Sequence, residues 1–507
     1  MKANPKIKNI KNLTEILQRL KKKNKRIILC HGVFDLLHPG HIRHLKDAKS
    51  RGDYLVVSIT KDEFIKKGFN RPVFNTKERL LSIAALEDVD YVCESPTADA
   101  IKVIKNLKPN YYIKGSDYKN LSLDDTNKIK LEKKTVEKIK GKILFTKTPI
   151  YSSSKILFDT GKIFTDTQKN YLDKISKNIN LQKFKDILKR IQNLKVLVIG
   201  ETIIDKYTFS QTIGKASKDP ILVIKEKNDI VFLGGAASVA QNIKGICRNV
   251  DFLSEIGPEK IYKSFINKKL KNVNKIFINR KNSSTIVKKR YVDEISNRKL
   301  LGVYNIDNSN IKKANNKIYN FLKQNIKKYD LIVVSDYGHG LIDNKISQMI
   351  VKKANNIFLN CQLNSNNIGF HSMKRYKGSK NVIINETELR YEMRDNSTDI
   401  SSLIKKFCSD NKFKNLIVTQ GINGAILYEK NKQKFTTTPA FAVKVIDKVG
   451  TGDVMLSVIS LFFAATKNHE VGVLAGSMFA SKSLLKFGNE DIVSVSELKK
   501  FFSTFLN

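Results

Sequence analysis

The chain has 507 residues, which is long enough for two or three domains with full hydrophobic cores. Hydrophobic residues make up 41% of it and charged residues 28%, a balance typical of folded domains rather than of disordered chains. No stretch approaches the roughly eighteen uninterrupted apolar residues of a membrane span, and residues 1–25 contain no signal-peptide core. The five cysteines are scattered and never form a CxxC pair, which favours reduced thiols over disulfides or metal ligands. We therefore expect a cytoplasmic protein.

The net charge is +44, from 92 Lys and Arg against 48 Asp and Glu. A charge of this size is typical of proteins that bind nucleic-acid phosphates. Here the excess is mostly lysine spread along the chain, without an arginine-rich tract or interleaved aromatic residues. It indicates a general lysine and asparagine bias, so we expect neither a nucleic acid nor a membrane as a partner.

The most informative stretch is residues 31–46, which contains four of the seven histidines and follows a short apolar run. The apolar run predicts a buried strand, and Pro39-Gly40 predicts that a helix begins at its carboxyl end. Free backbone N–H groups at such a helix start favour a bound phosphate, which His38 and His41 can flank. Helix-surface or core histidines are the plainer interpretation, and a zinc site lacks a Cys or carboxylate at ligand spacing.

Residues 32–41, GVFDLLHPGH, resemble the HxGH signature of the cytidylyltransferase-like superfamily of nucleotidyltransferases. The resemblance implies that His38 and His41 stabilise charge on the α-phosphate while a substrate phosphate displaces pyrophosphate. Imidazole suits this task near neutral pH, and Mg²⁺ is the expected helper. Gly32 and Phe34 lie in the same stretch and are expected to contact the nucleotide.

Strand and helix candidates alternate from residue 53 to residue 145, which predicts a doubly wound, Rossmann-like parallel sheet with its site at the strand carboxyl ends. The resemblance implies further phosphate contacts from Lys67, Arg71 and Arg79, in a segment that closes over the nucleotide. It implies another from Lys114 of a KGSDY stretch, in which Asp117 would contact the substrate. Ser152 and Ser153, at a serine-rich helix start, would complete the phosphate site. Each cation alone can be a solvated surface charge, and the serines can simply cap a helix. The absence of an RTEGIS stretch favours ATP, with CTP still open.

A new strand is predicted at residues 195–200, after a connector of helical spacing over residues 161–193. Much later, a predicted strand at residues 442–446 leads into residues 447–453, DKVGTGD, and an apolar helix. Two glycines there let backbone N–H groups point toward one spot, which predicts an anion hole for a moving phosphoryl group. Asp453 beside it is the candidate general base for a substrate hydroxyl, with a helix-capping aspartate as the alternative.

Residues 194–507 resemble the ribokinase-like (PfkB) carbohydrate kinases, which implies an α/β domain with a small β lid. In this family Lys288 and Tyr291 would lie in the lid and substrate strand, and Ser335 to Gly338 match the SDYGxG stretch of its heptose kinases. The resemblance implies that the sugar is contacted by Asp205, Gly234, Gly235 and Arg290. It implies that ATP is contacted by Thr419, Gly421, Gly424, Gly450, Thr451 and Gly452. Mg²⁺ would be bound through water by Asn385 and Glu388 of an NxxE motif.

Together the two halves resemble the bifunctional ADP-heptose synthases. This implies phosphorylation of D-glycero-D-manno-heptose 7-phosphate at O1 with ATP and, after a phosphatase step, transfer of AMP to the sugar 1-phosphate for lipopolysaccharide assembly. The chain differs from these enzymes in three respects. Its domain order is reversed, Ser238 stands where many relatives have Asn, and residues 360–364, NCQLN, replace a DPK stretch.

The predicted organisation is a nucleotidyltransferase domain at residues 1–160, a helical linker at 161–193 and a kinase domain at 194–507. Its partners would be a small-molecule sugar phosphate and a nucleotide, and a homodimer is left open. One alternative keeps both folds but uses CTP with another sugar or polyol phosphate. Another is a basic binding protein with disabled catalytic folds, which the intact motifs argue against.

Overall fold

The computed structural model describes residues 4–65, 72–115, 128–146, 164–279, 283–306, 311–364, 367–442, 444–490 and 492–506. The chain divides into two compact units, Met1–Thr165 with Ser503–Phe505 and Asp166–Phe502 with Leu506–Asn507. Both units are α/β, as predicted. No helix in the described part of the chain has the length and apolar character needed to cross a bilayer.

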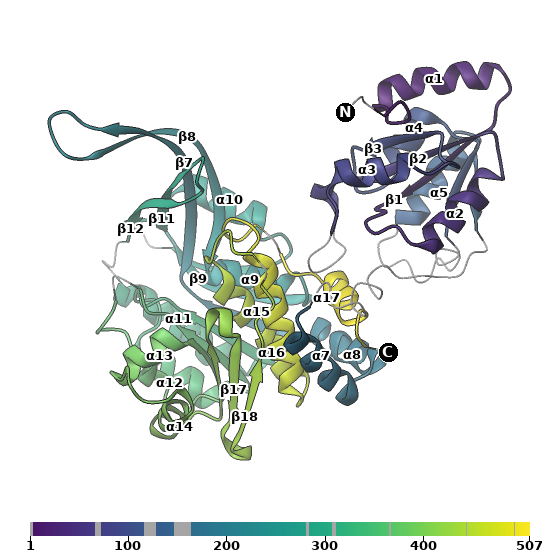
Figure 1. Cartoon of the computed structure of the whole chain (residues 1–507). Coiled ribbons are helices and arrows are strands. Elements are labelled where there is room, and N and C mark those ends of the chain that lie inside the picture. The colour runs from purple at the N-terminus through teal and green to yellow at the C-terminus, as the bar shows by residue number, and fades with distance from the viewer. Residues whose placement is uncertain are drawn as a thin grey trace. The chain divides into compact units, whose positions relative to one another are not determined.

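The first unit is built on a five-stranded parallel sheet of order β3-β2-β1-β4-β5 (Figure 1). Its elements are α1 (Ile10–Lys22), β1 (Ile27–Gly32), α2 (Pro39–Lys49), β2 (Tyr54–Thr60), α3 (Thr76–Ala84), β3 (Tyr91–Ser95), α4 (Ile101–Leu107), β4 (Tyr111–Lys114), α5 (Lys128–Lys138) and β5 (Lys142–Phe145). Apolar side chains of α2 and α3 cover one face of the sheet, and those of α1, α4 and α5 cover the other. Since the chain crosses from β3 back to β4 beside β1, the carboxyl end of β1 is the switch point at which such sheets bind ligands.

The second unit contains a nine-stranded sheet of order β10-β9-β6-β13-β14-β15-β16-β17-β18, in which β17 alone runs antiparallel to the other strands. Its strands are β6 (Lys195–Gly200), β9 (Asn249–Ile256), β10 (Asn274–Asn279), β13 (Leu331–Asp336), β14 (Ile357–Cys361), β15 (Asn381–Asn385), β16 (Asn415–Thr419), β17 (Ala425–Glu429) and β18 (Lys434–Thr438). The central strands β6 and β13 are nearly continuous apolar runs, which is what burial of both sheet faces requires.

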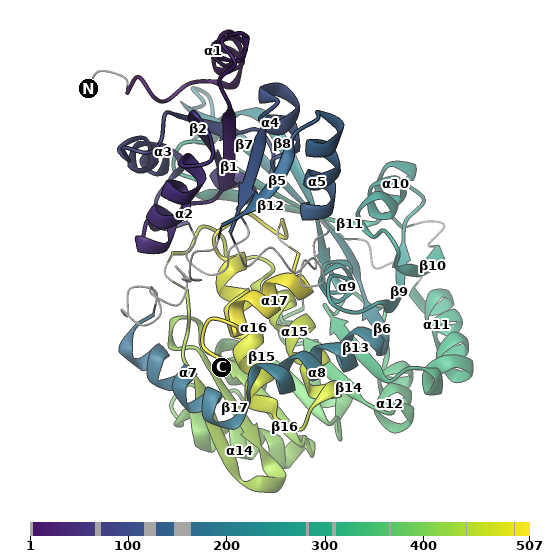
Figure 2. The ribbon, with the colours of Figure 1, turned by 90° about the vertical axis from the view of Figure 1, so that its right-hand side faces the viewer.

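Helices cover both faces of this sheet (Figure 2). They are α7 (Asp166–Asn178), α8 (Leu181–Asn193), α9 (Ala236–Lys244), α10 (Lys260–Lys269), α11 (Ile311–Asn325), α12 (Asn344–Lys353), α13 (Glu386–Met393), α14 (Ile400–Asn411), α15 (Thr451–Ala465), α16 (His469–Ser483) and α17 (Val495–Phe502). Residues of α11, α12, α13 and α14 share one apolar core, whereas α9 and α8 pack against α15. Each helix therefore buries an apolar stripe against the sheet or its neighbours.

The segment expected to be a connector folds as α7 and α8 and belongs to the second unit. Phe184 of α8 is fully buried and stacks on Phe502 of α17, with 3.9 Å between ring centroids. The helical spacing of this segment thus reflects a packed face rather than a free linker.

A second, four-stranded sheet of order β12-β11-β7-β8 forms the predicted β lid. Its strands are β7 (Thr202–Lys215), β8 (Leu222–Gly235), β11 (Ile286–Asp293) and β12 (Lys299–Asn305). The hairpin of β7 and β8 extends well away from the nine-stranded sheet (Figure 1). Its inner end places residues 203–205 and 234–235 beside the start of α9, so the lid supplies one wall of the site described below.

The predicted strand at residues 442–446 is wrong for the described residues 442 and 444–446, none of which lies in a strand. The backbone N–H of Ile446 instead donates a hydrogen bond to the Leu484 carbonyl at 2.7 Å. The side chains of Val445 and Ile446 are exposed. A short apolar run becomes a strand only where a neighbouring strand edge is available to pair with it.

Candidate active sites

In the first unit, the two histidines of the HxGH pattern lie together just beyond β1. His38 immediately precedes α2 and His41 lies in its first turn, and their rings stack with 3.8 Å between centroids. Phe34 lies edge-on to His41, with centroids 5.4 Å apart, and its backbone has the unusual φ of 48°. The turn after Gly32 therefore places two imidazoles at the amino end of a helix, where an anion is favoured.

Two further polar groups border this turn. Lys114, at the end of β4, is buried and its Nζ donates to the His31 carbonyl at 3.3 Å. The Asp35 carboxylate is also buried and accepts the N–H groups of Val73 and Phe74 at 2.7 and 3.1 Å. Asp35 thus holds the segment before α3 against the HxGH turn.

Arg79, for which a phosphate contact is predicted, lies inside the fold of the first unit. Its side chain is fully buried, and its five guanidinium N–H bonds are donated to the carbonyls of Phe74, Val33 and Thr60, the Asp62 carboxylate and the Thr76 hydroxyl. A guanidinium has five donors, so none remains for a ligand. Arg79 instead fastens the end of β2 and the turn after β1 to α3.

We expect Arg79→Leu to lower the free energy of unfolding of the first unit by about 2–4 kcal/mol, because it leaves buried carbonyl groups without donors. Hydrogen exchange on peptides from β2 and α3 during urea unfolding would measure this. Arg51→Leu is the matched control, since the Arg51 pair with Asp47 on α2 is partly exposed and should contribute less than about 1 kcal/mol. Equal effects of the two substitutions would contradict the structural role of Arg79.

Several predicted contacts of the first unit lie outside the described residues. They are Lys67, Arg71, Asp117, Ser152 and Ser153. Their roles stay predictions.

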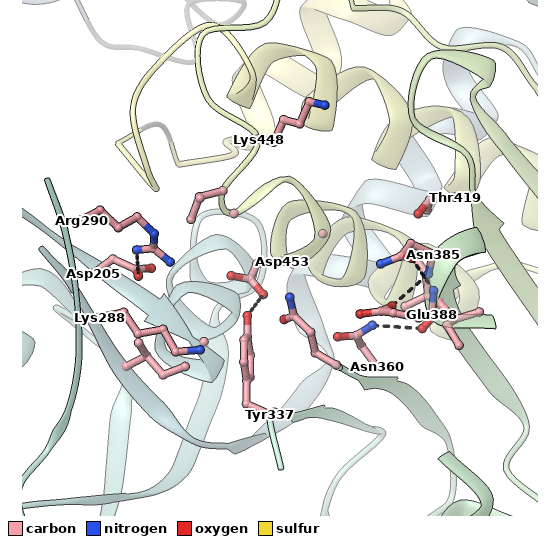
Figure 3. Close-up of a pocket in the computed structure, with 18 residues that line it drawn as sticks. Asp205, Lys288, Arg290, Tyr337, Asn360, Asn385, Glu388, Thr419, Lys448 and Asp453 are labelled. Carbon is pink, nitrogen blue, oxygen red and sulfur yellow. Dashed lines mark hydrogen bonds and ion pairs between the residues drawn. The ribbon is translucent and has the colours of Figure 1, made fainter. Parts of the chain in front are cut away.

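In the second unit, a cavity of about 310 Å³ lies at the carboxyl ends of the sheet strands, between the lid and the start of α15 (Figure 3). Nine residues predicted for sugar, ATP or Mg²⁺ line it: Asp205, Gly235, Arg290, Asn385, Glu388, Thr419, Gly450, Gly452 and Asp453. Four other predicted residues, all described, are not part of its lining: Gly234, Gly421, Gly424 and Thr451. The first of these lies directly behind the wall, because a Cβ on Gly234 would come within 2.2 Å of the Asp205 carboxylate.

Asp453 occupies the first turn of α15 and is buried at the centre of the cavity (Figure 3). The residue that caps this helix is Gly450, whose φ of 84° favours glycine and whose added Cβ would lie 1.8 Å from Asn489 Oδ1. Burial raises the pKa of Asp453 to about 7, opposed by the hydroxyl of Tyr337, which donates to Asp453 Oδ1 at 2.9 Å. A carboxylate with such a pKa beside helix N–H groups is suited to accept a proton from a hydroxyl.

A pH dependence follows, because only the ionised carboxylate of Asp453 can accept a proton. With the pKa near 7, we expect kcat/KM for phosphorylation to fall about tenfold per pH unit as the pH drops below 7. Initial rates between pH 5.5 and 9 would show this, and the same limb should persist in Glu388→Gln. A rate that stays flat down to pH 5.5 would contradict a proton-accepting Asp453.

One side of the cavity is rich in cations. Arg290 of β11 forms an ion pair with the buried Asp205 of β7, and Lys288 of the same strand lies 5.1 Å from the ring centroid of Tyr337 (Figure 3). Burial lowers the pKa of Lys288, although it remains beside the carboxylates of Asp205 and Asp453. Because Asp205 is already paired, this wall can receive an anionic or hydroxyl-rich substrate.

The opposite side carries Asn385 and Glu388, which form a capping box at the start of α13. Glu388 is buried, accepts the N–H groups of Asn385 and Leu363 at 3.1 and 3.3 Å, and burial raises its pKa to about 7. Each of its oxygens keeps acceptor capacity toward the cavity. A carboxylate of this kind fits Mg²⁺ held through water, so the donor chemistry agrees with the predicted metal site.

Sequence reasoning missed part of this cavity. Tyr337, Asn360, Gln362 and Lys448 line it without having been assigned a role there. The signal was available, since Tyr337 directly follows β13 and Asn360 is the penultimate residue of β14, and the carboxyl ends of parallel strands share one edge.

A buried cluster of Asp336, Cys361 and His371 also has metal-ligating atoms close together, within 4.8 Å of one another. The Asp336 carboxylate already accepts Gly338 N–H at 3.0 Å and the Tyr376 hydroxyl at 2.7 Å, and Arg375 lies 3.8 Å away. Burial raises the pKa of the Cys361 thiol, which disfavours the thiolate that a metal needs. These groups are therefore explained as a hydrogen-bonded network of the fold.

Comparison with known proteins decides the family of the second unit. The sequence pattern of the pfkB family carbohydrate kinases matches residues 193–494, more than half of the chain. The chain belongs to the pfkB family of carbohydrate kinases. Residues 29–157 match the pattern described as cytidylyltransferase-like. The combination of domains predicted from the motifs is thereby confirmed.

Curated relatives match in parts. "Bifunctional protein HldE" of Aliarcobacter butzleri is 27% identical over 304 residues, covering 58% of this chain and 61% of the relative. The protein of the same name from Geobacter metallireducens is 39% identical over 118 residues, covering 23% of this chain and 24% of the relative. The one from Campylobacter jejuni subsp. doylei is 37% identical over 148 residues, covering 27% and 32%. The chain thus spans less than two thirds of the length of each of these relatives.

Solved structures show the same fold for the pfkB unit. Ribokinase from Giardia lamblia aligns with a TM-score of 0.50 and 13% identity, covering 61% of this chain and all of that chain. Phosphofructokinase-2 from Escherichia coli in complex with potassium aligns with a TM-score of 0.50 and 15% identity, covering 62% and 99%. At these identities the likeness concerns the fold alone.

Proposed function

We propose that the protein is a cytoplasmic, two-site transferase that phosphorylates a sugar with ATP in its second unit and transfers a nucleotidyl group to a sugar 1-phosphate in its first. The observation that carries the proposal is the position of Asp453, buried in a cavity of the pfkB unit at the amino end of α15. The HxGH histidines at the switch point of the other sheet support the second activity.

In the kinase site, Asp453 accepts the proton of the sugar hydroxyl as its oxygen attacks the γ-phosphate of ATP, and ADP leaves. Backbone N–H groups at the start of α15 take up the developing negative charge. Asp205 and Arg290 orient the sugar from the lid side. Mg²⁺, when bound near Glu388, supplies charge neutralisation for the transferred phosphate.

In the transferase site, an oxygen of the sugar 1-phosphate attacks the α-phosphate of the nucleotide, and pyrophosphate leaves. His38 and His41 donate hydrogen bonds to the α-phosphate as charge builds, and the start of α2 adds its N–H groups. No covalent enzyme intermediate is required, since positioning and charge neutralisation are sufficient for such transfers.

The finer part of the proposal concerns the substrates. D-glycero-D-manno-heptose 7-phosphate, phosphorylated at O1, and AMP as the transferred group are supported by the joint presence of both domains and by the SDYG stretch at Ser335 to Gly338. The cations Lys288 and Arg290 suit a substrate that already carries a phosphate. The alternative is a CTP-dependent transfer to another sugar or polyol phosphate.

Pyrophosphate release separates these versions. Purified protein is given ATP or CTP, Mg²⁺ and a panel of sugar 1-phosphates that includes the heptose. Release with ATP and the heptose 1-phosphate is the expected result. Release with CTP alone would overturn the ADP-heptose version and favour the alternative.

A further inference from the structure

Tyr337 connects the backbone of the large sheet to the proposed general base. It follows β13 directly, its side chain is 8% exposed, and its hydroxyl donates to Asp453 Oδ1 at 2.9 Å (Figure 3). Burial raises the pKa of the Tyr337 hydroxyl well above its usual range, so the phenol keeps its proton and acts as the donor. The hydrogen bond therefore ends on a charged acceptor when Asp453 is ionised.

The backbone of Tyr337 is held from both sides. Its N–H is donated to the Glu201 carboxylate at 2.9 Å, and the same carboxylate accepts the N–H of His339 at 3.0 Å. Its carbonyl accepts side-chain amide N–H groups from Asn364 and Asn367, each at 2.9 Å. Three hydrogen bonds thus fix the two peptide units that flank Tyr337, and the fourth, from His339, fixes the peptide unit that follows them.

Part of this support comes from the stretch in which the chain departs from the usual DPK pattern. Asn364 ends the NCQLN stretch, and its backbone N–H is donated to Asn367 Oδ1 at 2.8 Å, which orients the second amide. A side-chain amide can donate to a carbonyl, and the amides of Asn364 and Asn367 both do so here. The two amides therefore form a clamp on Tyr337.

We propose that Tyr337 is a positioning residue for Asp453, held in place by Glu201 and by the amides of Asn364 and Asn367. The inference rests on the proposed kinase function and adds to it the group that sets the orientation and charge of the base. Without the phenol, the Asp453 carboxylate would lose a donor inside a buried cavity, where a missing hydrogen bond is costly.

Other charged groups also face Asp453 and bear on its titration. Asp205 of β7 raises the pKa of Asp453 and Lys288 of β11 lowers it, each after the larger effect of burial. Glu388 of α13 and Lys448 line the same cavity. Because none of these is altered in Tyr337→Phe, a changed pH profile in that variant reports the lost hydroxyl.

Tyr337→Phe tests the inference, since it keeps the ring and removes one hydrogen bond. We expect the acid limb of kcat/KM for sugar phosphorylation to move up by about one pH unit, because a hydrogen bond to a charged group favours ionisation by about this amount. At pH 7 kcat should fall about fivefold, because the ionised fraction of Asp453 drops from about one half to about one tenth, with KM for the sugar nearly unchanged. Asn364→Ala, which loosens the clamp and spares the phenol, should move the limb in the same direction by less.

Tyr376→Phe is the matched control. Its fully buried hydroxyl donates to an aspartate too, Asp336 Oδ2 at 2.7 Å, but has no bond to Asp453. This variant should lose a similar amount of stability and keep the wild-type limb. The inference would be overturned if the acid limb of kcat/KM stayed at its wild-type pH in both Tyr337→Phe and Asn364→Ala. It would also be overturned if Tyr376→Phe moved that limb as far as Tyr337→Phe does. Either result would leave the kinase function in place. If Asp453→Asn phosphorylated the sugar at the wild-type rate, that result would instead contradict the proposed role of Asp453 in the kinase reaction.

Discussion

Asp453→Asn is expected to lower kcat for sugar phosphorylation by about 10²–10⁴-fold, the usual contribution of a positioned general base. Asparagine keeps the shape of the side chain and its contact with Tyr337, but it cannot accept the proton of the substrate hydroxyl. The loss should appear in kcat and kcat/KM together, because the interaction belongs to the transition state. Coupled ADP release would measure it.

The control for this variant is the other reaction of the same protein sample. Nucleotidyl transfer, followed by pyrophosphate release, should stay at the wild-type rate, because the HxGH histidines belong to the other compact unit. Loss of both reactions would argue against independent sites. Loss of neither would show that another group accepts the proton.

His41→Ala should produce the reverse pattern, with nucleotidyl transfer reduced by about 10²–10³-fold and phosphorylation unchanged. Its ring lies in the first turn of α2 and stacks on His38, so its removal deletes one donor to the α-phosphate and loosens the other. Pyrophosphate release at saturating nucleotide would measure the effect.

His44→Gln offers a matched control on the same helix. Its ring bonds to the Thr146 hydroxyl at 2.9 Å, and burial lowers its pKa to about 4, so it is neutral at working pH. Glutamine can keep that hydrogen bond, and the rate should stay near that of the wild type. An equal loss in His41→Ala and His44→Gln would indicate a general effect on α2 rather than chemistry at the HxGH pair.

Much of the architecture could be predicted because local signals and tertiary packing agree. Buried parallel strands such as β6 and β13 are nearly continuous apolar runs, and the glycines at 450 and 452 mark the start of α15. Where a motif joins a strand end to a helix start, the chain itself fixes the geometry. The HxGH turn and the GTGD turn are both of this kind.

The remaining features depend on partners distant in sequence. Arg79 has the spacing of a surface cation on α3, but its five acceptors come from several separate segments. The spacing of residues 166–193 indicates helices but does not indicate which elements pack against them. Phe184 stacks on Phe502, which lies more than three hundred residues later in the chain. Tyr337 reaches Asp453 across the sheet edge in the same way.

Product mass is the most direct test of the two-site account. The protein is incubated with D-glycero-D-manno-heptose 7-phosphate, ATP and Mg²⁺, then with a phosphatase that removes the 7-phosphate, and the products are analysed by mass spectrometry. For the wild-type protein the account predicts a heptose bisphosphate first and then the mass of ADP-heptose. Asp453→Asn should form neither product from the heptose 7-phosphate, and His41→Ala should form the bisphosphate but not ADP-heptose. Absence of the bisphosphate in the wild-type reaction, or absence of the ADP-heptose mass after the phosphatase step, would contradict it.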